Sequence, residues 1–597
     1  MHTLVHKDLW FFLMMFRERG DKMNTTFSVL QRDKTIQDIT AQELDLLVIG
    51  GGITGAGIAL DAQVRGIKTA VIEMQDFASG TSNRSTKLVH GGLRYLKQFE
   101  VGLVAEVGKE RAIVYENGPH VTTPVWMLLP IIQGGTYGKM ASSIGIYVYD
   151  ILAGVKHSER RQMLGLDATL KKEPLLRKDG LKGSGYYVEY RTDDARLTLE
   201  ILKEAVERGT LAVNYMKAVD LIYRQGKLCG VKVNDLLSGE THEIYAKKIV
   251  NATGPWVDEL RTKDGSKEGK SLHHTKGVHI VVDGERFPLQ NSVYFDVPDG
   301  RMIFAIPRDG KTYIGTTDTD YHGDLTFPRM TARDRDYLIN CVNFMFPSVR
   351  LQADDVESSW VGIRPLVHEE GKGPSEISRK DEVFHSATGL ITIAGGKLTG
   401  YRKMADKVTS IVAAELARES GKHFPACTTD KIQISGGKFG GSKNFQTYVS
   451  AKIDEGVQLG LTLAEAKKLV HRYGTNCEEV FDLIRQRGNE AAAHGLSAEV
   501  FASLLYSIHS EMTVTPSDFF IRRTASLYFD IEWVRRWQEP VINFMANLYG
   551  WSDSQINRHH RDLQQRIREA VETVENDDSA NTDAAAADRG LSQSVLV

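Results

Sequence analysis

A glycine-rich turn at residues 46–57 carries the clearest chemical signal in the sequence. The string LLVIGGGITGAG places Gly50, Gly52 and Gly55 in the G-x-G-x-x-G spacing after an apolar, β-prone run. The first glycine allows a tight turn, the second lets the backbone approach a pyrophosphate, and the third lets the next helix pack against its strand. Because the helix N-terminus faces the negative charge, the sequence predicts a dinucleotide site.

An acidic residue follows this turn at the distance that such a site requires. Glu73 ends a second β-prone run, TAVIE (69–73), where it would hold the adenosine ribose hydroxyls. The helix between the two runs is predicted to end at Gly66. Strand, glycines, helix, strand and acid together predict a βαβ unit, although the glycine motif alone suits NAD, NADP and FAD alike.

The segment after Glu73 is rich in small hydroxylated and basic residues. Residues 76–96 read DFASGTSNRSTKLVHGGLRYL. Such clusters usually mark loops, but backbone amides and hydroxyls can also crowd a ligand, and basic groups suit phosphates. Its place directly after a ribose-binding acid favours contact with the cofactor.

The length and composition limit the classes of protein to which this chain can belong. With 597 residues, two or three domains are expected. The 42% hydrophobic and 25% charged content is that of ordinary globular proteins, and the net charge of −3 argues neither for nucleic acid nor for a strongly anionic membrane surface as a partner. The four cysteines, Cys229, Cys341, Cys427 and Cys477, form no C-x-x-C pair. We therefore expect no metal or disulfide framework, and a cytoplasmic location.

Both chain ends lie outside the predicted core. Residues 1–40 are assigned as an N-terminal extension, whose apolar run LWFFLMMF (9–16) is shorter than the roughly 20 residues that span a bilayer. The run lacks a small-residue cleavage site, which leaves an interfacial anchor or a translated upstream extension with the start at Met23. We favour the second. Residues 576–597 are poor in bulky apolar residues and are predicted to be disordered.

From about residue 425 the pattern becomes helical. SGGKFGG (435–441) is typical of a linker, because it lacks the G-K-[ST] ending of a phosphate loop. Thr462 and Glu465 form a capping-box signature before a helix that stops at Gly474. We predict a helical domain at 426–575 with a structural or dimerisation role.

An ordered set of strings resembles the FAD-dependent glycerol-3-phosphate dehydrogenases. The strings are GGGITGAG, EMQDFASGTSNRSTKLVHGGLRYL, VNATGPW (250–256), KGVHIVV (276–282), YIGTTDTD (313–320), GIRPL (362–366) and ITIAGGKLTGYRKMA (391–405), and, in the last third, HRYGTN (471–476) and TPSDFFIRRT (515–524). Each string by itself is modest evidence for this family, whereas the whole set in this order is specific for it.

The resemblance implies an α/β flavoprotein of the two-dinucleotide-binding-domain class, with a Rossmann-like FAD domain, a β-rich substrate domain and a C-terminal helical domain. The oxidoreductase region would span residues 41–425. Within it the FAD domain would be discontinuous, at about 45–110, 196–255 and 386–420, and the substrate domain would take about 111–195 and 256–385.

The resemblance also implies the site residues. The expected cofactor-binding residues are Gly50, Gly52, Gly55, Glu73, Thr81, Ser82, Ser85, Lys87, Leu88, Gly91, Gly92, Ala252, Gly254, Gly396, Lys397, Leu398 and Thr399. The expected substrate-binding residues are Arg94, Tyr95, Arg379 and Lys397, because a phosphate dianion needs several cationic donors.

Two residues are candidates for the catalytic step. His279 is the best general base by type, since its reference pKa is near neutrality. Arg364 is the rival, because a guanidinium stabilises a forming alkoxide without taking its proton. Which of them handles the hydroxyl proton stays open from the sequence.

The implied reaction is oxidation of sn-glycerol 3-phosphate to dihydroxyacetone phosphate by hydride transfer to flavin N5. Membrane quinone is the expected acceptor, through peripheral contact with the cytoplasmic membrane, and a homodimer is a further possibility. The alternatives are an oxygen-reducing glycerol-3-phosphate oxidase that forms hydrogen peroxide, an amino-acid or amine oxidase of the same fold, and a flavin-binding scaffold without turnover.

Overall fold

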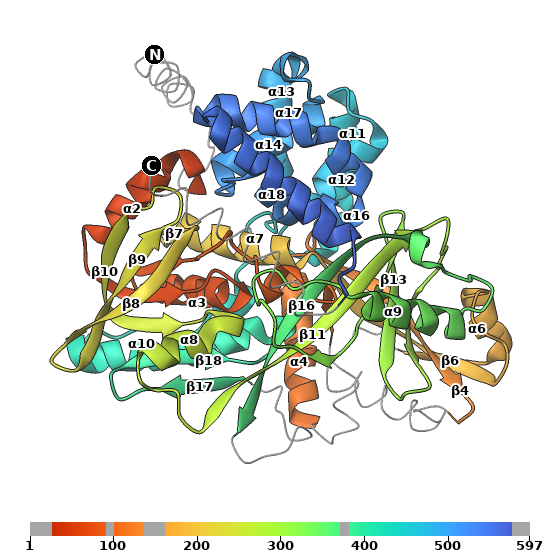
Figure 1. Ribbon diagram of the computed structural model, residues 1–597, viewed down its shortest axis with the longest axis horizontal. Helices are drawn as coiled ribbons and strands as arrows, with labels where there is room; N and C mark the ends of the chain where they lie inside the picture. The colour runs from red at the N-terminus through yellow and green to blue at the C-terminus, as the bar shows by residue number, and fades with distance from the viewer. Residues whose placement is uncertain (1–26, 91–100, 135–160, 370–380, 576–597) are drawn as a thin grey trace.

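The computed structural model describes residues 27–90, 101–134, 161–369 and 381–575. The described chain forms two β-sheets side by side, with the C-terminal helices above them (Figure 1). Several predicted features lie outside the described residues, namely the apolar run 9–16, the site residues Gly91, Gly92, Arg94, Tyr95 and Arg379, and the tail 576–597.

The first sheet is built on the predicted βαβ unit. Its order is β17-β18-β10-β1-β2-β7, with β1, β2, β7, β10 and β18 parallel and β17 antiparallel. The bounds are β1 Leu44–Ile49, β2 Thr69–Ile72, β7 Leu211–Val213, β10 Thr241–Asn251, β17 Glu382–His385 and β18 Leu390–Ala394. Parallel strands covered on both faces are apolar throughout, which explains why LLVI and TAVI lack alternation.

Helices complete this first layer. They are α2 Arg32–Thr40, α3 Ile53–Val64, α7 Asp194–Glu207, α8 Val257–Lys263 and α10 Tyr401–Ser420. Helix α3 packs against both α7 and α10, so segments far apart in sequence close around the glycine motif. The hairpin of β8 (Met216–Arg224) and β9 (Lys227–Asp235) extends the sheet by pairing with β10.

The second sheet carries the predicted catalytic strings. Its order is β15-β11-β14-β13-β12-β4-β6-β3, and β16 and β5 pair with β11 and β6. The bounds are β3 Leu88–Val89, β4 Thr122–Ile132, β5 Gln162–Leu164, β6 Leu181–Thr192, β11 Lys270–Asp283, β12 Ser292–Asp296, β13 Met302–Arg308, β14 Lys311–Gly315, β15 Thr319–Asp320 and β16 Val356–Glu369. Helices α4 Val101–Asn117, α6 Leu166–Lys172 and α9 Ala332–Met345 accompany it. The long pairing of β11 with β16 sets His279 opposite Trp360.

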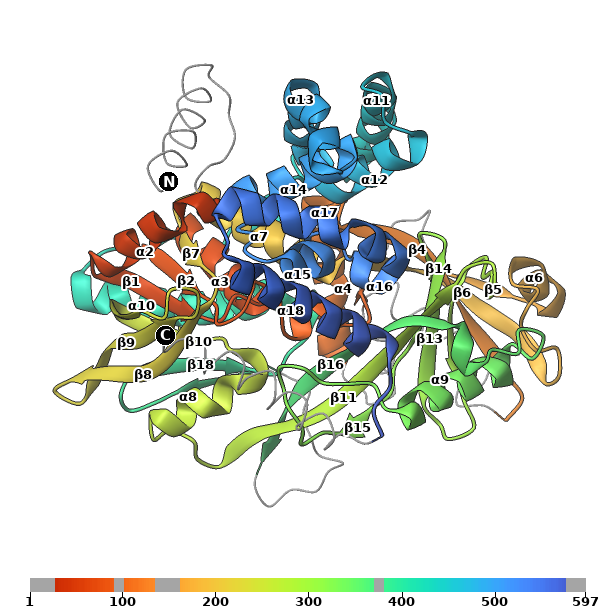
Figure 2. The same cartoon turned by 45° about the horizontal axis from the view of Figure 1, so that its top comes forward.

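The C-terminal helices pack on both sheets. They are α11 Phe445–Gln458, α12 Leu463–Tyr473, α13 Cys477–Arg487, α14 Ala498–Ser510, α15 Pro516–Asp518, α16 Ser526–Phe529, α17 Ile531–Tyr549 and α18 Asp553–Val571. Thr462 and Glu465 form the capping box that the sequence predicts. Figure 2 shows these helices over the sheets, with α18 beside β16. One apolar core therefore joins Trp360 of β16 to the helices.

Part of the assigned N-terminal extension is packed into the fold. Phe27 is fully buried, and Arg32 at the start of α2 forms an ion pair of 2.7 Å with Asp235 of β9. Residues 27–40, at the end of the predicted extension, therefore bury apolar and charged groups against the first sheet.

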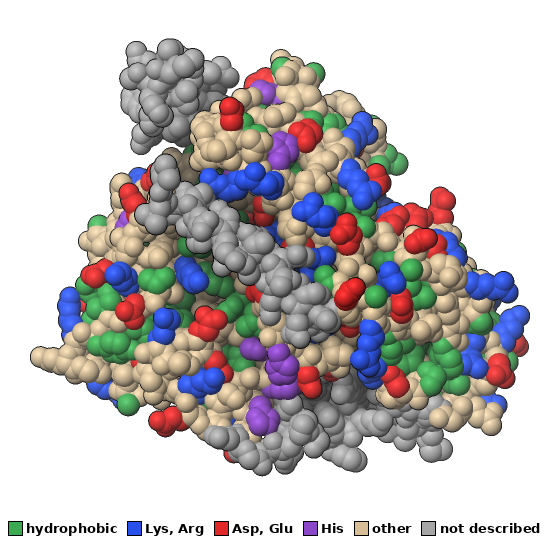
Figure 3. Space-filling model, in the orientation of Figure 1, with side chains coloured by type: hydrophobic (Ala, Val, Ile, Leu, Met, Phe, Trp, Pro, Cys, Tyr) green, Lys and Arg blue, Asp and Glu red, His purple; other side chains and the backbone are tan. Residues whose placement is uncertain are grey.

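The molecular surface agrees with the small net charge. On the face shown in Figure 3, basic and acidic side chains are interspersed, so this face presents no single basic field of the kind that attracts polyanions. In the part of the chain that the structure describes, no helix combines the length and apolar character needed to cross a membrane.

Candidate active site

A cavity opens at the carboxyl ends of β1, β2 and β10. Its volume is about 1350 Å³, part of it open to solvent. Dinucleotides bind parallel α/β sheets in this position. The cavity is lined by these predicted cofactor residues: Gly50, Gly52, Glu73, Thr81, Ser82, Ser85, Ala252, Gly254, Gly396, Lys397 and Leu398.

The glycines of the motif have distinct steric roles. Gly50 has a φ of +114°, and a Cβ there would lie 2.4 Å from the carbonyl oxygen of Ala252. A Cβ at Gly55 would lie 1.9 Å from the carbonyl oxygen of Gly50. Gly55 does not line the cavity, but only glycine at this position lets α3 approach its strand so closely.

We predict that Gly55→Ala weakens both the fold and cofactor retention. The added methyl must displace backbone, and overpacking of this kind costs about 1–3 kcal/mol. Visible absorbance per protein and the thermal midpoint of the purified variant measure the two effects. Gly165→Ala is the matched control, because a Cβ at Gly165 meets no atom within 4 Å. Unchanged cofactor content and midpoint in Gly55→Ala would contradict this account.

Glu73 lies in the cavity wall and is held by the backbone. Its carboxylate accepts hydrogen bonds from the N–H groups of Gly51 at 2.7 Å and Gln75 at 2.9 Å. Burial raises the pKa of Glu73 above its usual value, although these two N–H groups act in the opposite direction. The side chain is thus fixed beside the glycine turn, where a ribose would lie.

The side chain of Lys87 forms a buried ion pair that the sequence did not predict. Its side chain is 0% exposed, and the ammonium donates to Asp194 at 2.6 Å and to the carbonyl oxygen of Asn83 at 2.8 Å. Neither Lys87 nor Leu88, which lies in β3, lines the cavity. The contact of Lys87 with the cofactor stays a prediction, and the ammonium of this residue is bound to Asp194.

Thr399 also lies behind the cavity wall. Its hydroxyl accepts a hydrogen bond from the N–H of His90 and donates one to the carbonyl oxygen of His90, both at 3.2 Å. It therefore ties the loop after Lys397 to the loop at residues 81–90.

Several cavity residues were missed from the sequence. Trp256 and Pro255 follow β10, Met216 and Lys217 begin β8, and Pro365 lies on β16. The string VNATGPW could have indicated Trp256, because it follows directly on the predicted cofactor residues Ala252 and Gly254. No local signal marks the residues of β8.

Arg364 is anchored beside the cavity-lining Pro365. Its guanidinium donates to Asp318 at 2.9 Å, to the Thr316 hydroxyl at 2.9 Å and to the Thr317 carbonyl oxygen at 3.2 Å. These partners come from the YIGTTDTD string, which is one of the strings that carry the family resemblance. The contacts fix the direction of the guanidinium, and its side chain stays partly exposed.

His279 is buried in the second sheet. Its imidazole is parallel to the Trp360 ring at 4.8 Å between centroids, and its Nε2 lies 3.0 Å from the Thr86 hydroxyl. Burial, followed by the charges of Arg364 and Lys87, holds the pKa of His279 well below its usual range. The imidazole is therefore neutral at pH 7 and keeps a lone pair for a proton, while the same burial and charges disfavour its protonated form.

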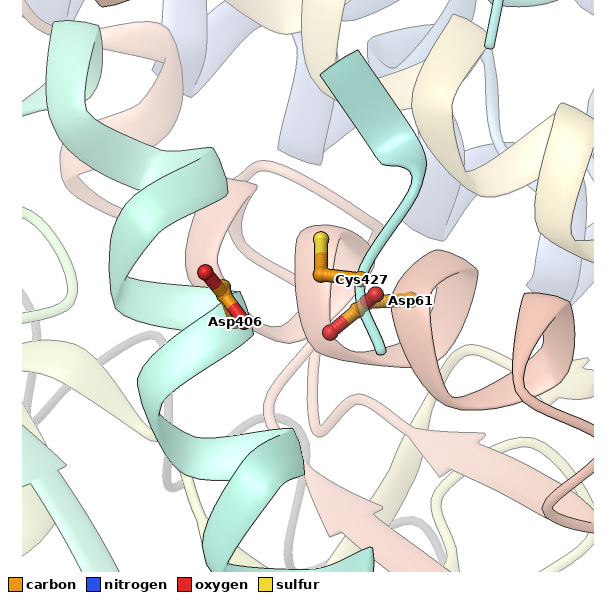
Figure 4. A group of neighbouring side chains, drawn as sticks. All are labelled: Asp61, Asp406 and Cys427. Atoms are coloured by element: carbon orange, nitrogen blue, oxygen red, sulfur yellow. The ribbon is translucent and has the colours of Figure 1, made fainter. Parts of the chain in front are cut away.

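A separate group of side chains has the composition of a metal site. Asp61, Asp406 and Cys427 converge between α3 and α10 (Figure 4). However, Arg65 donates to both carboxylates, at 2.6 Å to Asp61 and 2.9 Å to Asp406. An ion pair thus accounts for this cluster.

Comparison with known proteins defines the class first. A model of the family described as FAD dependent oxidoreductase matches residues 45–402, and one described as the C-terminal domain of alpha-glycerophosphate oxidase matches residues 427–556. The sheets, the glycine turn and the cavity are those of this class of flavoprotein, which confirms the predicted fold class.

Individual relatives narrow the class. The chain is 59% identical over 553 residues to the aerobic glycerol-3-phosphate dehydrogenase of Bacillus subtilis, covering 93% of this chain and 100% of that protein. It is 53% identical to the enzyme of the same name from Staphylococcus epidermidis, over 91% of this chain and 98% of that one. The glycerol-3-phosphate dehydrogenase of Bacillus halodurans, solved in complex with FAD, superposes with a TM-score of 0.80 at 51% identity, covering 92% and 99% of the two chains. The chain belongs to the aerobic glycerol-3-phosphate dehydrogenase family.

Proposed function

We propose that this protein oxidises sn-glycerol 3-phosphate to dihydroxyacetone phosphate with FAD as cofactor. The observation that carries the proposal is a cavity built on a dinucleotide motif, with a neutral His279 and a fixed Arg364 on the neighbouring sheet. The relatives named for this reaction, together with the FAD complex of the B. halodurans protein, support both the substrate and the cofactor.

The residues present fit FAD. Gly50 and Gly52 leave room for a pyrophosphate at the start of α3, Glu73 lies where the ribose hydroxyls would be, and Gly396 and Lys397 line the cavity beyond. Bound FAD supplies the acceptor for a hydride from carbon 2 of the substrate.

Side chains of the protein then supply proton acceptance, charge stabilisation and phosphate binding. His279 accepts the proton of the C2 hydroxyl, because its imidazole is neutral. Arg364 stabilises the negative charge that develops on that oxygen. Lys397 in the cavity wall, with Arg94, Tyr95 and Arg379, binds the phosphate.

The decisive experiment is an anaerobic visible spectrum before and after addition of glycerol 3-phosphate. Bleaching of the flavin bands would support cofactor and substrate together. A flavin spectrum that does not change would keep the fold and discard the substrate, and an absence of flavin after reconstitution with FAD would overturn the proposal.

We predict that Arg364→Ala lowers kcat/KM for glycerol 3-phosphate by more than tenfold. A loss of this size corresponds to about 1.4 kcal/mol of transition-state stabilisation, the least expected for removing a fixed guanidinium beside a forming alkoxide. Arg301→Ala is the control, since Arg301 pairs with Asp299 on the surface of the same sheet. A wild-type kcat/KM in Arg364→Ala would remove Arg364 from the site.

We further propose that membrane quinone takes the electrons, that contact with the membrane is peripheral, and that the cytoplasm is the compartment. The name shared by the relatives supports a dehydrogenase. The match to the C-terminal domain of an oxidase keeps oxygen as the second candidate. Stoichiometric peroxide without quinone would favour oxygen, whereas turnover that requires quinone would exclude it. Gel filtration tests the possible homodimer.

A further inference from the structure

The hydrogen bond between His279 and Thr86 can form with either group as donor, so the tautomer of His279 decides which of its nitrogens can act. Nε2 lies 3.0 Å from the Thr86 hydroxyl. Nδ1 is buried, and no described residue offers it a hydrogen-bond partner. A neutral imidazole carries its proton on one nitrogen and keeps a lone pair on the other. A proton on Nε2 that is donated to Thr86 would therefore leave Nδ1 as the basic nitrogen.

The segment around Thr86 is fixed from both sides by one carboxylate. Ser85 donates to Asp194 Oδ2 through its N–H at 3.0 Å and its hydroxyl at 2.7 Å. Lys87 donates to Asp194 Oδ1 at 2.6 Å. Thr86 is thus the central residue of a short segment whose two neighbours are bound to the same buried side chain.

The same segment also holds Trp360, the residue that stacks on the imidazole of His279. Trp360, which stacks on His279, donates its indole N–H to the carbonyl oxygen of Ser85 at 2.9 Å. The Lys87 ammonium lies 5.3 Å from the Trp360 ring and 5.6 Å from the Tyr528 ring. The ring plane and the Nε2 contact of His279 therefore depend on one local structure.

The cost of this structure argues for a role beyond stability. Lys87 and Asp194 are both 0% exposed, and a buried ion pair often stabilises a protein no better than apolar side chains of the same size. Such a pair can instead serve to specify one arrangement of the groups around it. Here the groups arranged around the Lys87–Asp194 pair include Thr86 and, through it, His279.

We propose that Thr86 is a positioning residue for the reaction, held by the Asp194–Lys87 pair, and that it fixes the His279 tautomer that leaves Nδ1 free to accept the substrate's hydroxyl proton. The inference rests on the proposed function, because it names the atom that takes the proton. The charged groups near His279 are Arg364 on β16 and Lys87, the latter neutralised by Asp194 at the start of α7.

The test compares Thr86→Val with Thr86→Ser in the FAD-loaded enzyme. Valine keeps the shape and removes the acceptor, so we expect flavin reduction at saturating substrate to slow about tenfold, with FAD content, thermal midpoint and KM unchanged. Loss of the acceptor also disfavours the imidazolium, so the acid limb of the pH–rate profile should move to lower pH. Serine should restore both rate and profile. Wild-type rates and profile in Thr86→Val would overturn the proposal.

A second readout does not depend on the substrate. Histidine nitrogen NMR of the holoenzyme, with the His279 signal assigned by its loss in His279→Ala, reports the tautomer directly. We expect the Nε2-protonated form in the wild type and a mixture in Thr86→Val. An Nδ1-protonated His279 in the wild type would overturn the inference even if glycerol 3-phosphate proved not to be the substrate.

The role of the ion pair is tested by removing both charges together. The variant Lys87→Met with Asp194→Asn avoids leaving one buried charge uncompensated. If the pair acts through Thr86, adding Thr86→Val to this variant should slow flavin reduction no further, whereas additive effects would contradict the link. Should the variant not fold, the comparison of Thr86→Val with Thr86→Ser still decides the role of Thr86.

Discussion

Replacing His279 by alanine should slow flavin reduction by about 10²–10⁴-fold, the range attributed to a general base, while FAD stays bound. His279 is 1% exposed, and it belongs to the second sheet rather than to the glycine turn. Stopped-flow anaerobic reduction measures the rate, and the flavin absorbance of the purified variant measures the cofactor. His242→Ala on the β9–β10 hairpin is the matched control. If His279→Ala lost FAD, the residue would be structural instead.

The pH dependence of the wild-type enzyme checks the same assignment. The pKa of His279 is held well below its usual value, mainly by burial. The base is therefore unprotonated at pH 7 and becomes protonated only as the pH falls through the lowered pKa. We expect the rate of flavin reduction to be flat through neutrality and to fall in acid. A rate that falls already between pH 8 and pH 6.5, about the unperturbed pKa, would contradict a lowered pKa.

The second large effect is on stability. We expect Arg523→Ala to lower the free energy of unfolding by about 3–5 kcal/mol, the usual cost of breaking a buried pair. Arg523 donates to Asp76 at 2.7 Å and 2.9 Å, and both side chains are 0% exposed. Arg522 contacts the same carboxylate. Denaturant unfolding of the holoprotein measures the change.

Loss of the Arg523–Asp76 pair should also weaken the binding of the cofactor. Asp76 lies three residues after Glu73, so the C-terminal domain holds the segment that forms part of the cavity wall. Buried Arg523 and Arg522 outweigh the burial of Asp76 and hold its pKa at about 2. Arg535→Ala is the control, because Arg535 pairs with Glu532 on the exposed face of α17. A change below 1 kcal/mol in Arg523→Ala, within the range of ordinary surface pairs, would show that Asp76 does not depend on this partner.

The sequence by itself determined the parts of the protein that follow local rules. The G-x-G-x-x-G turn and Glu73 predicted the βαβ unit, since the tight turn, the close approach of Gly55 to Gly50 and the following acid all lie within one short stretch of the chain. Thr462 and Glu465 predicted a helix start, because a capping box is complete within four residues. The ordered strings predicted the family, and the relatives confirm it.

Only the tertiary structure decided the partners of the buried charged and catalytic groups. The Lys87 ammonium binds Asp194, which is 107 residues away. Thr86 meets His279 across 193 residues, and Arg523 meets Asp76 across 447. A side chain's type indicates that it needs a partner when it is buried. Which partner it finds depends on the packing of distant elements, and no local pattern in the sequence records that packing.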